Sequence, residues 1–162
     1  MIAQTAVFRE ARRGDVPAIV AMLADDFLGA GRETTEIDDV YWTAFDAIAA
    51  DPRNRLIVAE ADGQVVGTLQ LTLLPGLSRR GMLRAQIESV RVAAPLRGQG
   101  LGREMLSWAI GEARKAGCGL VQLTSNKRRG DAIRFYESLG FEASSEGLKL
   151  PLLSRRLHAA RK

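Results

Sequence analysis

Residues 86–102 read QIESVRVAAPLRGQGLG, and this stretch decides the fold because it joins a strand to a helix through closely spaced glycines. The alternation before the glycines predicts a strand over Ala85–Ala93. After them, apolar residues recur at helical spacing, which predicts a helix from Leu101 that Gly117 closes. Glycine lets the backbone approach a ligand closely, and the first amides of a helix carry the positive end of its dipole. The stretch therefore predicts a phosphate-binding turn.

Two better-known phosphate loops do not fit these letters. A P-loop would end in Gly-Lys-Ser or Gly-Lys-Thr, and the dinucleotide fingerprint requires glycine at the position of Arg103. Taken alone, a glycine-rich turn that holds no ligand is the alternative interpretation, because short motifs also occur by chance.

The chain around this stretch shows further strands and helices. The predicted strands are Val7–Ala11, Arg55–Ala61, Gln64–Leu74 and Leu120–Thr124, with one or two short ones within Phe141–Leu150. Three further helices are predicted. One begins after Asp15, which caps it; one follows Thr34-Thr35; and one covers Ala132–Leu139 and ends before Gly140. Asp62-Gly63 predicts a tight turn between the two central strands, so we expect an antiparallel meander in the middle of the chain.

One domain is expected from 162 residues of which 46% are apolar, enough for a core without disulfides or metal. We expect this domain over residues 1–151 and a basic tail over 152–162. Cys118 is the only cysteine, and the N-terminal sequence lacks the apolar run of a secretion signal, so a cytoplasmic protein without membrane contact is expected. Apart from the run Lys127–Arg129 the cations are dispersed, so nucleic acid is not an expected partner.

Charge is distributed unevenly along the chain. From Asp15 to Asp51 nine acidic residues stand against one basic residue, a net charge of −8, while Arg79 to Arg103 carries six arginines against Glu88, a net charge of +5. Such a division suits a site that holds a polyanion on one side and a cation on the other. Alternatively, the three carboxylates of residues 36–39 only stabilise the start of a helix, by about 0.3–1 kcal/mol each. Both interpretations stay open.

Two motifs in a fixed order make the pattern specific. The first is the Arg-x-x-Gly-x-Gly turn of Arg97–Gly102, and the second is the Phe-Tyr-Glu-x-x-Gly-Phe run of Phe135–Phe141, with a helix and a strand between them. Together they resemble the GNAT superfamily of N-acetyltransferases over about Val7 to Leu150. The resemblance implies an α+β fold whose central, mostly antiparallel twisted sheet is splayed at the cofactor strand and flanked by about four helices.

The resemblance also implies acetyl-CoA as the cosubstrate. No metal is expected, because the sequence shows no cluster of metal ligands. The backbone of Gly98–Arg103 would cradle its pyrophosphate, and the strand Ser89–Val92 would offer backbone groups to the pantetheine arm, a form of strand addition. A backbone N–H near Val90 or Arg91 would donate to the thioester oxygen. The implied cofactor-binding residues are Val90, Arg91, Val92, Arg97, Gly98, Gln99, Gly100, Leu101, Gly102, Arg103 and Asn126.

Asn126 enters through a departure from the family pattern. Many members carry an asparagine seven residues before the tyrosine, and Arg129 stands at that position here. Either Asn126 substitutes for that contact, or a cation of Lys127–Arg129 meets the phosphates instead. Solvated cations are the third interpretation.

Transfer to an amine needs a neutral nucleophile and a proton for the departing thiolate. An alkyl amine resembles lysine, with a pKa of about 10.4, so a base must remove a proton first. Glu88, the only carboxylate on the predicted cofactor strand, is the candidate base, directly or through water, or else an ordinary solvent-facing glutamate. The resemblance implies that Tyr136 protonates the coenzyme sulfur, and the alternative is a core tyrosine. Cys118 is expected to pack as a small, buried apolar side chain and not to act as a nucleophile.

The first two helices and their connection would form the acceptor cleft. The candidate substrate contacts there are Asp25, Asp26, Phe27, Glu33 and Trp42, and the acidic character of this stretch predicts a cationic primary amine as the acceptor. The amine is expected to attack the thioester directly in a ternary complex, because no covalent intermediate is required. A non-catalytic acyl-CoA-binding module of the same fold is the alternative function. Exposed strands near the C-terminus make a homodimer a further expectation.

Overall fold

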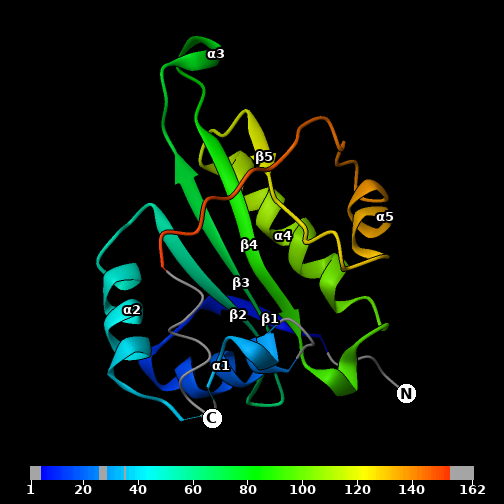
Figure 1. Ribbon diagram of the computed structural model, residues 1–162. Helices are drawn as coiled ribbons and strands as arrows, with labels where there is room; N and C mark the ends of the chain where they lie inside the picture. Colours follow the sequence, from blue (N-terminus) through cyan, green and yellow to red (C-terminus); the bar gives the residue numbers. More distant parts are fainter. Residues whose placement is uncertain (1–4, 26–28, 35, 154–162) are drawn as a thin grey trace. The chain divides into compact units, whose positions relative to one another are not determined.

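Five strands form one mixed sheet in the order β1-β2-β3-β4-β5 (Figure 1). The strands are β1 Val7–Glu10, β2 Asn54–Ala61, β3 Gln64–Leu74, β4 Arg84–Val92 and β5 Leu120–Gln122. The first four run antiparallel to their neighbours, and β5 lies parallel to β4. The predicted meander is confirmed, and the tight turn at Asp62 and Gly63 has the two positive φ angles, 51° and 72°, that a two-residue hairpin loop requires.

The computed structural model describes residues 5–25, 29–34 and 36–153, and it divides into two compact units, Met1–Leu123 and Thr124–Lys162. The first unit holds the sheet with the helices α1 to α4, and the second holds α5. The helices are α1 Val16–Ala24, α2 Asp39–Ala49, α3 Ser78–Gly81, α4 Leu101–Lys115 and α5 Ala132–Glu137, with 3-10 turns η1 Arg13–Asp15, η2 Gly29–Gly31 and η3 Ala94–Leu96. The expected domain limits, 1–151 and 152–162, stay a prediction.

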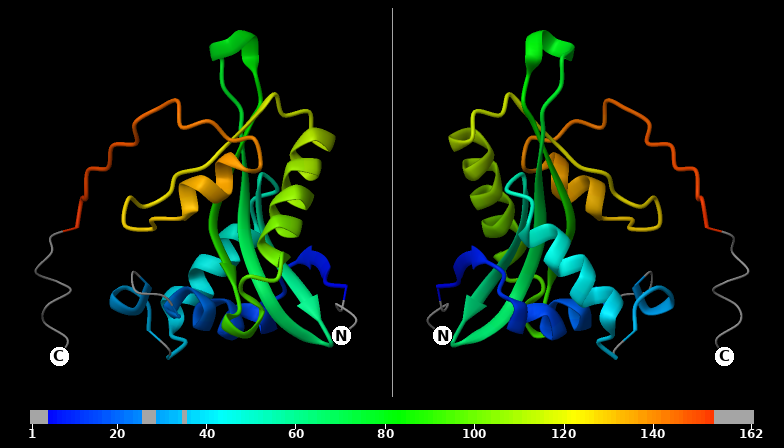
Figure 2. Two further views of the ribbon diagram at one scale, coloured as in Figure 1. Left: turned by 90° about the vertical axis from the view of Figure 1, so that its right-hand side faces the viewer. Right: turned by 90° about the vertical axis from the view of Figure 1, so that its left-hand side faces the viewer.

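The helices of the first unit cover both faces of its sheet, with α4 on one face and α1 and α2 on the other (Figure 2). Met105 and Leu106 of α4 are at most 1% exposed, and they pack on the face that buries Leu69 and Ile87. Gly67 lies below α4, and a Cβ there would come within 2.6 Å of the Met105 sulfur. The absence of a side chain at Gly67 therefore lets α4 approach the sheet closely.

Asp15 precedes α1, as predicted, but its carboxylate does not cap that helix. It accepts two hydrogen bonds from the Arg9 guanidinium, at 2.7 and 3.1 Å, and one from the Arg12 amide at 2.7 Å. The same guanidinium donates to Glu60 at 2.6 Å. The sequence prediction of a helix cap is wrong in this detail because a fixed cation on β1 competes for the carboxylate. The hydrogen bonds from Arg9 hold the pKa of Asp15 below its usual range.

Replacing Asp15 with asparagine should therefore destabilise the protein in a pH-dependent way. A depressed folded-state pKa gives stability that is present above the unfolded value of about 3.9 and is lost as the pH falls through the folded value. We expect Asp15→Asn to lower the free energy of unfolding at pH 7 by about 1–3 kcal/mol, the range for hydrogen bonds to charged groups. Urea unfolding between pH 7 and pH 3 should show the difference from wild type shrinking with acidification.

Asp46→Asn is the matched control, because Asp46 pairs with Arg13 where both side chains are more than half exposed. Exposed pairs contribute about 0–1 kcal/mol, so this variant should unfold almost as the wild type does. An Asp15→Asn deficit that stays the same at pH 3 and pH 7 would show that the charge of Asp15 is not what stabilises the fold.

In the second unit, the Phe-Tyr-Glu-x-x-Gly-Phe run forms the C-terminal end of α5 and the turn after it. Gly140 has a φ of 96°, its amide donates to the Glu137 carbonyl at 2.9 Å, and the Phe141 amide donates to the Tyr136 carbonyl at 3.1 Å. The Tyr136 and Phe141 rings meet edge to face with centroids 5.9 Å apart. These two bonds and the apolar contact across them form a Schellman motif, which needs glycine at its left-handed position. The predicted stop at Gly140 is confirmed.

The expectation of one or two short strands within 141–150 is wrong. Residues 141–153 carry no strand, and a backbone hydrogen bond there is local, from the Ser144 amide to the Glu142 carbonyl. Alternating residues predict a strand only where a neighbouring strand can accept the pairing, and no such pairing forms in the described residues of this unit.

Candidate active site

Strand β4 is interrupted by a bulge. Leu69 of β3 lies between two paired positions, whereas β4 places two residues, Ser89 and Val90, in the same interval. Ser89 has a φ of 55°, in the left-handed region that residues other than glycine rarely adopt. An extra residue of this kind breaks the ladder locally and leaves backbone groups outside it. The bulge therefore lies within the predicted cofactor strand, beside Glu88.

The outer edge of β4 is open beyond its first third. β5 pairs with β4 only over Arg84–Gln86, and among the described strands of the first unit none lies on that edge from Ile87 onward. The predicted splay of the sheet at the cofactor strand is confirmed. Backbone groups along an open edge can pair with an extended chain that carries amides.

The glycine turn leads from β4 through η3 into α4. Gly98 and Gly100 have φ angles of 75° and 92°, which glycine adopts without strain, and Gly100 caps α4. A Cβ on either residue would meet no atom within 4 Å, so the space beside the turn is open. The amides of a first helical turn have no acceptor inside the helix, and here they belong to residues 101–103 at the positive end of the dipole. These donors and this space suit a diphosphate.

Arg97 links the glycine turn to Asp25, the residue that follows α1, by hydrogen bonds. Its guanidinium donates to the Val92 carbonyl at 3.2 Å, and to the carbonyl and a carboxylate oxygen of Asp25 at 3.0 and 3.2 Å. The side-chain amide of Gln99 donates to the Pro95 carbonyl at 2.9 Å. Both side chains hold the turn in shape through contacts inside the first unit. Cofactor contacts by Arg97 and Gln99 stay predictions.

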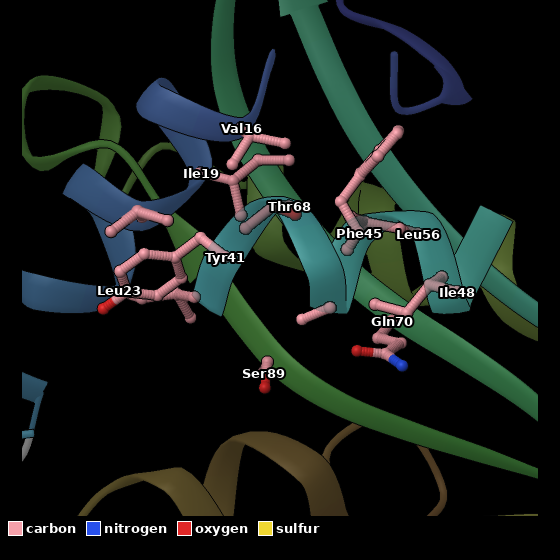
Figure 3. Close-up of a pocket in the computed structure, with 12 residues that line it drawn as sticks. Val16, Ile19, Leu23, Tyr41, Phe45, Ile48, Leu56, Thr68, Gln70 and Ser89 are labelled. Carbon is pink, nitrogen blue, oxygen red and sulfur yellow. The ribbon is translucent and has the colours of Figure 1, made fainter. Parts of the chain in front are cut away.

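A cavity of about 130 Å³ lies between α1, α2 and the sheet (Figure 3). Each of the two helices contributes four side chains, and strands β2 to β4 contribute the others. The lining residues are Val16, Ile19, Val20, Leu23, Tyr41, Ala44, Phe45, Ile48, Leu56, Thr68, Gln70 and Ser89. Because Ser89 belongs to the bulge of β4, the cavity and the predicted cofactor strand share a wall.

Of the predicted substrate residues, Asp25, Glu33 and Trp42 are described, and none of them lines this cavity. Glu33 accepts a hydrogen bond of 2.9 Å from the hydroxyl of Tyr41, which is a lining residue. Trp42 stacks its ring under the Arg13 guanidinium, 4.8 Å from the ring centroid, on a side of α2 away from the lining residues. Asp26 and Phe27 lie outside the described residues. Contacts of these residues and of Asp25 with an acceptor stay predictions.

The lining residues of α2 were visible in the sequence only as an apolar stripe. Tyr41, Ala44, Phe45 and Ile48 recur at helical spacing, a pattern that also predicts an ordinary core face. Periodicity alone cannot tell a face that lines a cavity from one that fills a core.

In the described residues, several charges of the two stretches are paired within the protein or lie far from the start of α4. Several carboxylates of the acidic stretch already have partners: Asp15 pairs with Arg9, Asp25 with Arg97 and Asp46 with Arg13, and Asp38 accepts from the Val40 amide. In the basic stretch, Arg79 and Arg80 lie in α3 at the tip of the β3–β4 connection, at the opposite end of the sheet from the start of α4 (Figure 1). The structure therefore favours the capping interpretation for Asp38.

Glu88 is exposed and shares a sheet face with cavity residues. The register aligns it with Gln70 of β3, which in turn aligns with Leu56 of β2, and both of these line the cavity. Side chains at aligned positions of neighbouring strands point to the same face. Glu88 therefore lies on the cavity side of the predicted cofactor strand, and its side chain is exposed.

The remaining predicted site residues lie in the second unit. Tyr136 packs between Phe135 and Phe141, with ring centroids 5.3 and 5.9 Å away. Asn126 accepts a hydrogen bond from the Arg128 amide at 2.9 Å, which folds its side chain into its own turn. Roles for Tyr136 and Asn126 toward the cofactor stay predictions.

Thiol chemistry and metal binding have little support in the described residues. Cys118 is half-buried, and burial raises the pKa of its thiol, which disfavours the reactive thiolate. Within residues 5–25, 29–34 and 36–153, no group of three or more histidine, cysteine or acidic side chains is placed to hold a metal ion. In the same ranges no helix combines the length and the apolar character that crossing a bilayer would require.

The open, bulged strand and the glycine turn suit an extended ligand that carries phosphate, and the apolar cavity adjoins the same strand. The sequence model of the Acetyltransferase (GNAT) family matches residues 16–141, and the chain belongs to this family. The recognition made from the Arg97–Gly102 and Phe135–Phe141 motifs is confirmed. Acetyl-CoA is the cosubstrate typical of the family.

Relatives with assigned names share part of the chain. An aminoalkylphosphonate N-acetyltransferase of Salmonella typhimurium is 37% identical over 100 residues, which are 62% of this chain and 64% of that protein. A glucosamine 6-phosphate N-acetyltransferase of Trypanosoma brucei brucei is 34% identical over 90 residues, 56% of this chain and 59% of that protein. The chain thus spans about three fifths of the length of these curated relatives.

A solved structure from Bacillus halodurans C-125, named as a transcriptional regulator, is 48% identical with a TM-score of 0.89. It covers 91% of this chain, and all of that chain is matched. The similarity extends the shared fold over nearly the whole sequence.

Proposed function

We propose that this protein transfers the acetyl group of acetyl-CoA to a primary amine by direct attack in a ternary complex. The observation that carries the proposal is the course of β4, which passes from an open, bulged edge through the glycine turn into the N-terminus of α4. The pantetheine arm would pair along that edge and the diphosphate would accept from the amides of residues 98–103. An N–H of Val90 or Arg91 would then donate to the thioester oxygen as charge develops, a contact whose loss costs about 2.7–4 kcal/mol in other enzymes.

The protein's largest contribution would be to hold the two substrates together. Aligning an amine with a thioester can lower the barrier by roughly 7–11 kcal/mol, because the entropy of encounter is already lost on binding. The amine nitrogen forms a bond to the acetyl carbon, and the carbon–sulfur bond breaks. The amine gives up its proton to Glu88, directly or through water, and the thiolate takes a proton from Tyr136. The bonds and protons of the reaction therefore balance, and no covalent enzyme intermediate is needed.

Support for an amine acceptor comes from the names of the relatives. Both curated relatives are N-acetyltransferases, and an aminoalkylphosphonate and a glucosamine each offer a primary amine. Both named acceptors also carry an acidic phosphorus group. An acceptor with an anionic group differs from the cationic amine that the acidic stretch predicts. In the structure, Asp15, Asp25 and Asp46 of that stretch form ion pairs with arginines.

An acceptor screen that follows release of free thiol tests the proposal. The protein with acetyl-CoA and a broad panel of primary amines should release thiol with at least one amine, in amounts equal to the acetylated product. Binding of acetyl-CoA without thiol release across the panel would contradict the proposal and favour the non-catalytic module. Failure to bind acetyl-CoA would contradict both.

A further inference from the structure

The cavity between α1 and α2 has an apolar body. The side chains that α1 contributes are all aliphatic, and α2 adds Ala44, Phe45 and Ile48 next to the ring of Tyr41. Figure 3 shows these side chains gathered over the strands, with Ser89 on β4 apart from them. None of the lining residues among the described parts of the chain is a lysine, arginine, histidine, aspartate or glutamate.

The polar groups that do line the cavity are mostly occupied within the protein. The Thr68 hydroxyl donates to the Ile57 carbonyl at 2.9 Å, and the Gln70 amide donates to Asn54 at 2.7 Å. The Tyr41 hydroxyl donates to Glu33 at 2.9 Å. Ser89 differs from these residues in its position, because it lies on β4, the predicted cofactor strand, next to Glu88. The polar end of the cavity therefore lies at β4, and its apolar body lies under the two helices.

The volume sets the size of the occupant. A cavity of about 150 Å³ lined by leucine, isoleucine and phenylalanine stays dry and binds benzene in another protein, and this cavity is about 130 Å³. One six-membered ring or a short alkyl chain would fill it. A phosphonate or phosphate group there would be a charge without a partner, at a cost of several kcal/mol or more.

We infer that the acceptor of this protein is a primary amine on a small apolar body, an arylalkylamine or alkylamine, held with its ring or chain under α1 and α2 and its nitrogen toward Ser89 and Glu88. The inference rests on the proposed function and names its substrate class. Apolar surroundings also disfavour the charged form of an amine, so the same cavity helps to deliver the neutral nucleophile.

A competition between amine classes tests this assignment. We would compare kcat/KM by thiol release for phenethylamine, a series from ethylamine to hexylamine, 2-aminoethylphosphonate, glucosamine 6-phosphate and putrescine. Each added methylene should raise kcat/KM by about fourfold until the cavity is full. Phenethylamine should exceed 2-aminoethylphosphonate by at least about tenfold, as expected when an apolar pocket discriminates.

Filling the cavity should remove this preference. Ala44→Phe adds a ring at a residue that lines the cavity, and Ala47→Phe makes the same change at a position of α2 that does not line it; both positions are exposed. We expect Ala44→Phe to lower kcat/KM for phenethylamine by at least about tenfold and to leave the KM for acetyl-CoA unchanged, which also shows that the variant is folded. Ala47→Phe should behave as the wild type.

A ligand without an amine gives a readout that does not depend on turnover. Toluene, detected by ligand-observed NMR, should bind the wild type and Ala47→Phe, should be displaced by phenethylamine, and should not bind Ala44→Phe. Thiol release with phosphonate, phosphate or diamine acceptors but not with the apolar amines would overturn this inference and leave the proposed function standing. No thiol release with any amine would overturn both.

Discussion

Tyr136→Phe should lower kcat for acetyl transfer on the order of 100-fold or more, at the low end of the range for a lost general acid. A tyrosine hydroxyl, with a pKa of about 10, carries its proton at neutral pH, and that value is close enough to the thiol value of about 8.5 for the hydroxyl to donate the proton as the thiolate departs. The ring of residue 136 packs against Phe141 at the end of α5, and phenylalanine keeps that ring. The variant should therefore keep the fold and the KM for acetyl-CoA while turnover falls.

Tyr41→Phe is the matched control, since Tyr41 is the only other tyrosine. Its hydroxyl accepts from the Thr34 amide at 3.0 Å and donates to Glu33, so its loss should alter the connection beside the cavity. That change should act on the KM for the amine with little effect on kcat. Equal kcat for Tyr136→Phe and wild type would remove Tyr136 from the mechanism.

Glu88→Gln should lower kcat/KM at pH 7 by about 100-fold, because glutamine keeps the shape of the side chain but cannot accept the amine proton. The deficit should shrink as the pH rises toward the pKa of the amine, about 10.4 for an alkyl amine, where the acceptor arrives already neutral. The measurement is the pH dependence of thiol release from pH 6.5 to 9.5 with saturating acetyl-CoA.

Glu36→Gln serves as the control for Glu88→Gln, because Glu36 is also exposed but lies outside β4. It should leave kcat/KM unchanged at every pH. A Glu88→Gln profile that runs parallel to the wild type across the range would assign Glu88 a positioning role or none, and the proton would then pass to water directly.

Much of the fold could be predicted because local patterns and tertiary structure agree. Strand β3 was expected and is observed over Gln64–Leu74, and α4 begins at Leu101 after the glycine turn as predicted. Alternation in the strands and helical spacing in α4 each match a buried face of the sheet. The glycines at 117 and 140 close their helices with positive φ angles, which is chemistry that the letters themselves specify.

The site could be predicted only in part, because its details depend on partners that are distant in sequence. Arg97 and Asp25 are 72 residues apart, and nothing local in either segment predicts that they pair. The bulge at Ser89 carries no glycine to signal a left-handed residue, so the letters indicate a regular strand there. The cavity arises from two helices and three strands together, and each taken alone has the pattern of an ordinary core element.

The central claim is that main-chain amides at the start of α4 hold the diphosphate of the cosubstrate while the open edge of β4 carries its acyl arm. A crystal structure of the protein with coenzyme A tests it most directly. We expect diphosphate oxygens within about 3.2 Å of amide nitrogens between residues 98 and 103, and the pantetheine amides paired with backbone groups of Ser89–Val92. A coenzyme bound elsewhere, or a β4 edge closed by protein along its whole length, would contradict the account.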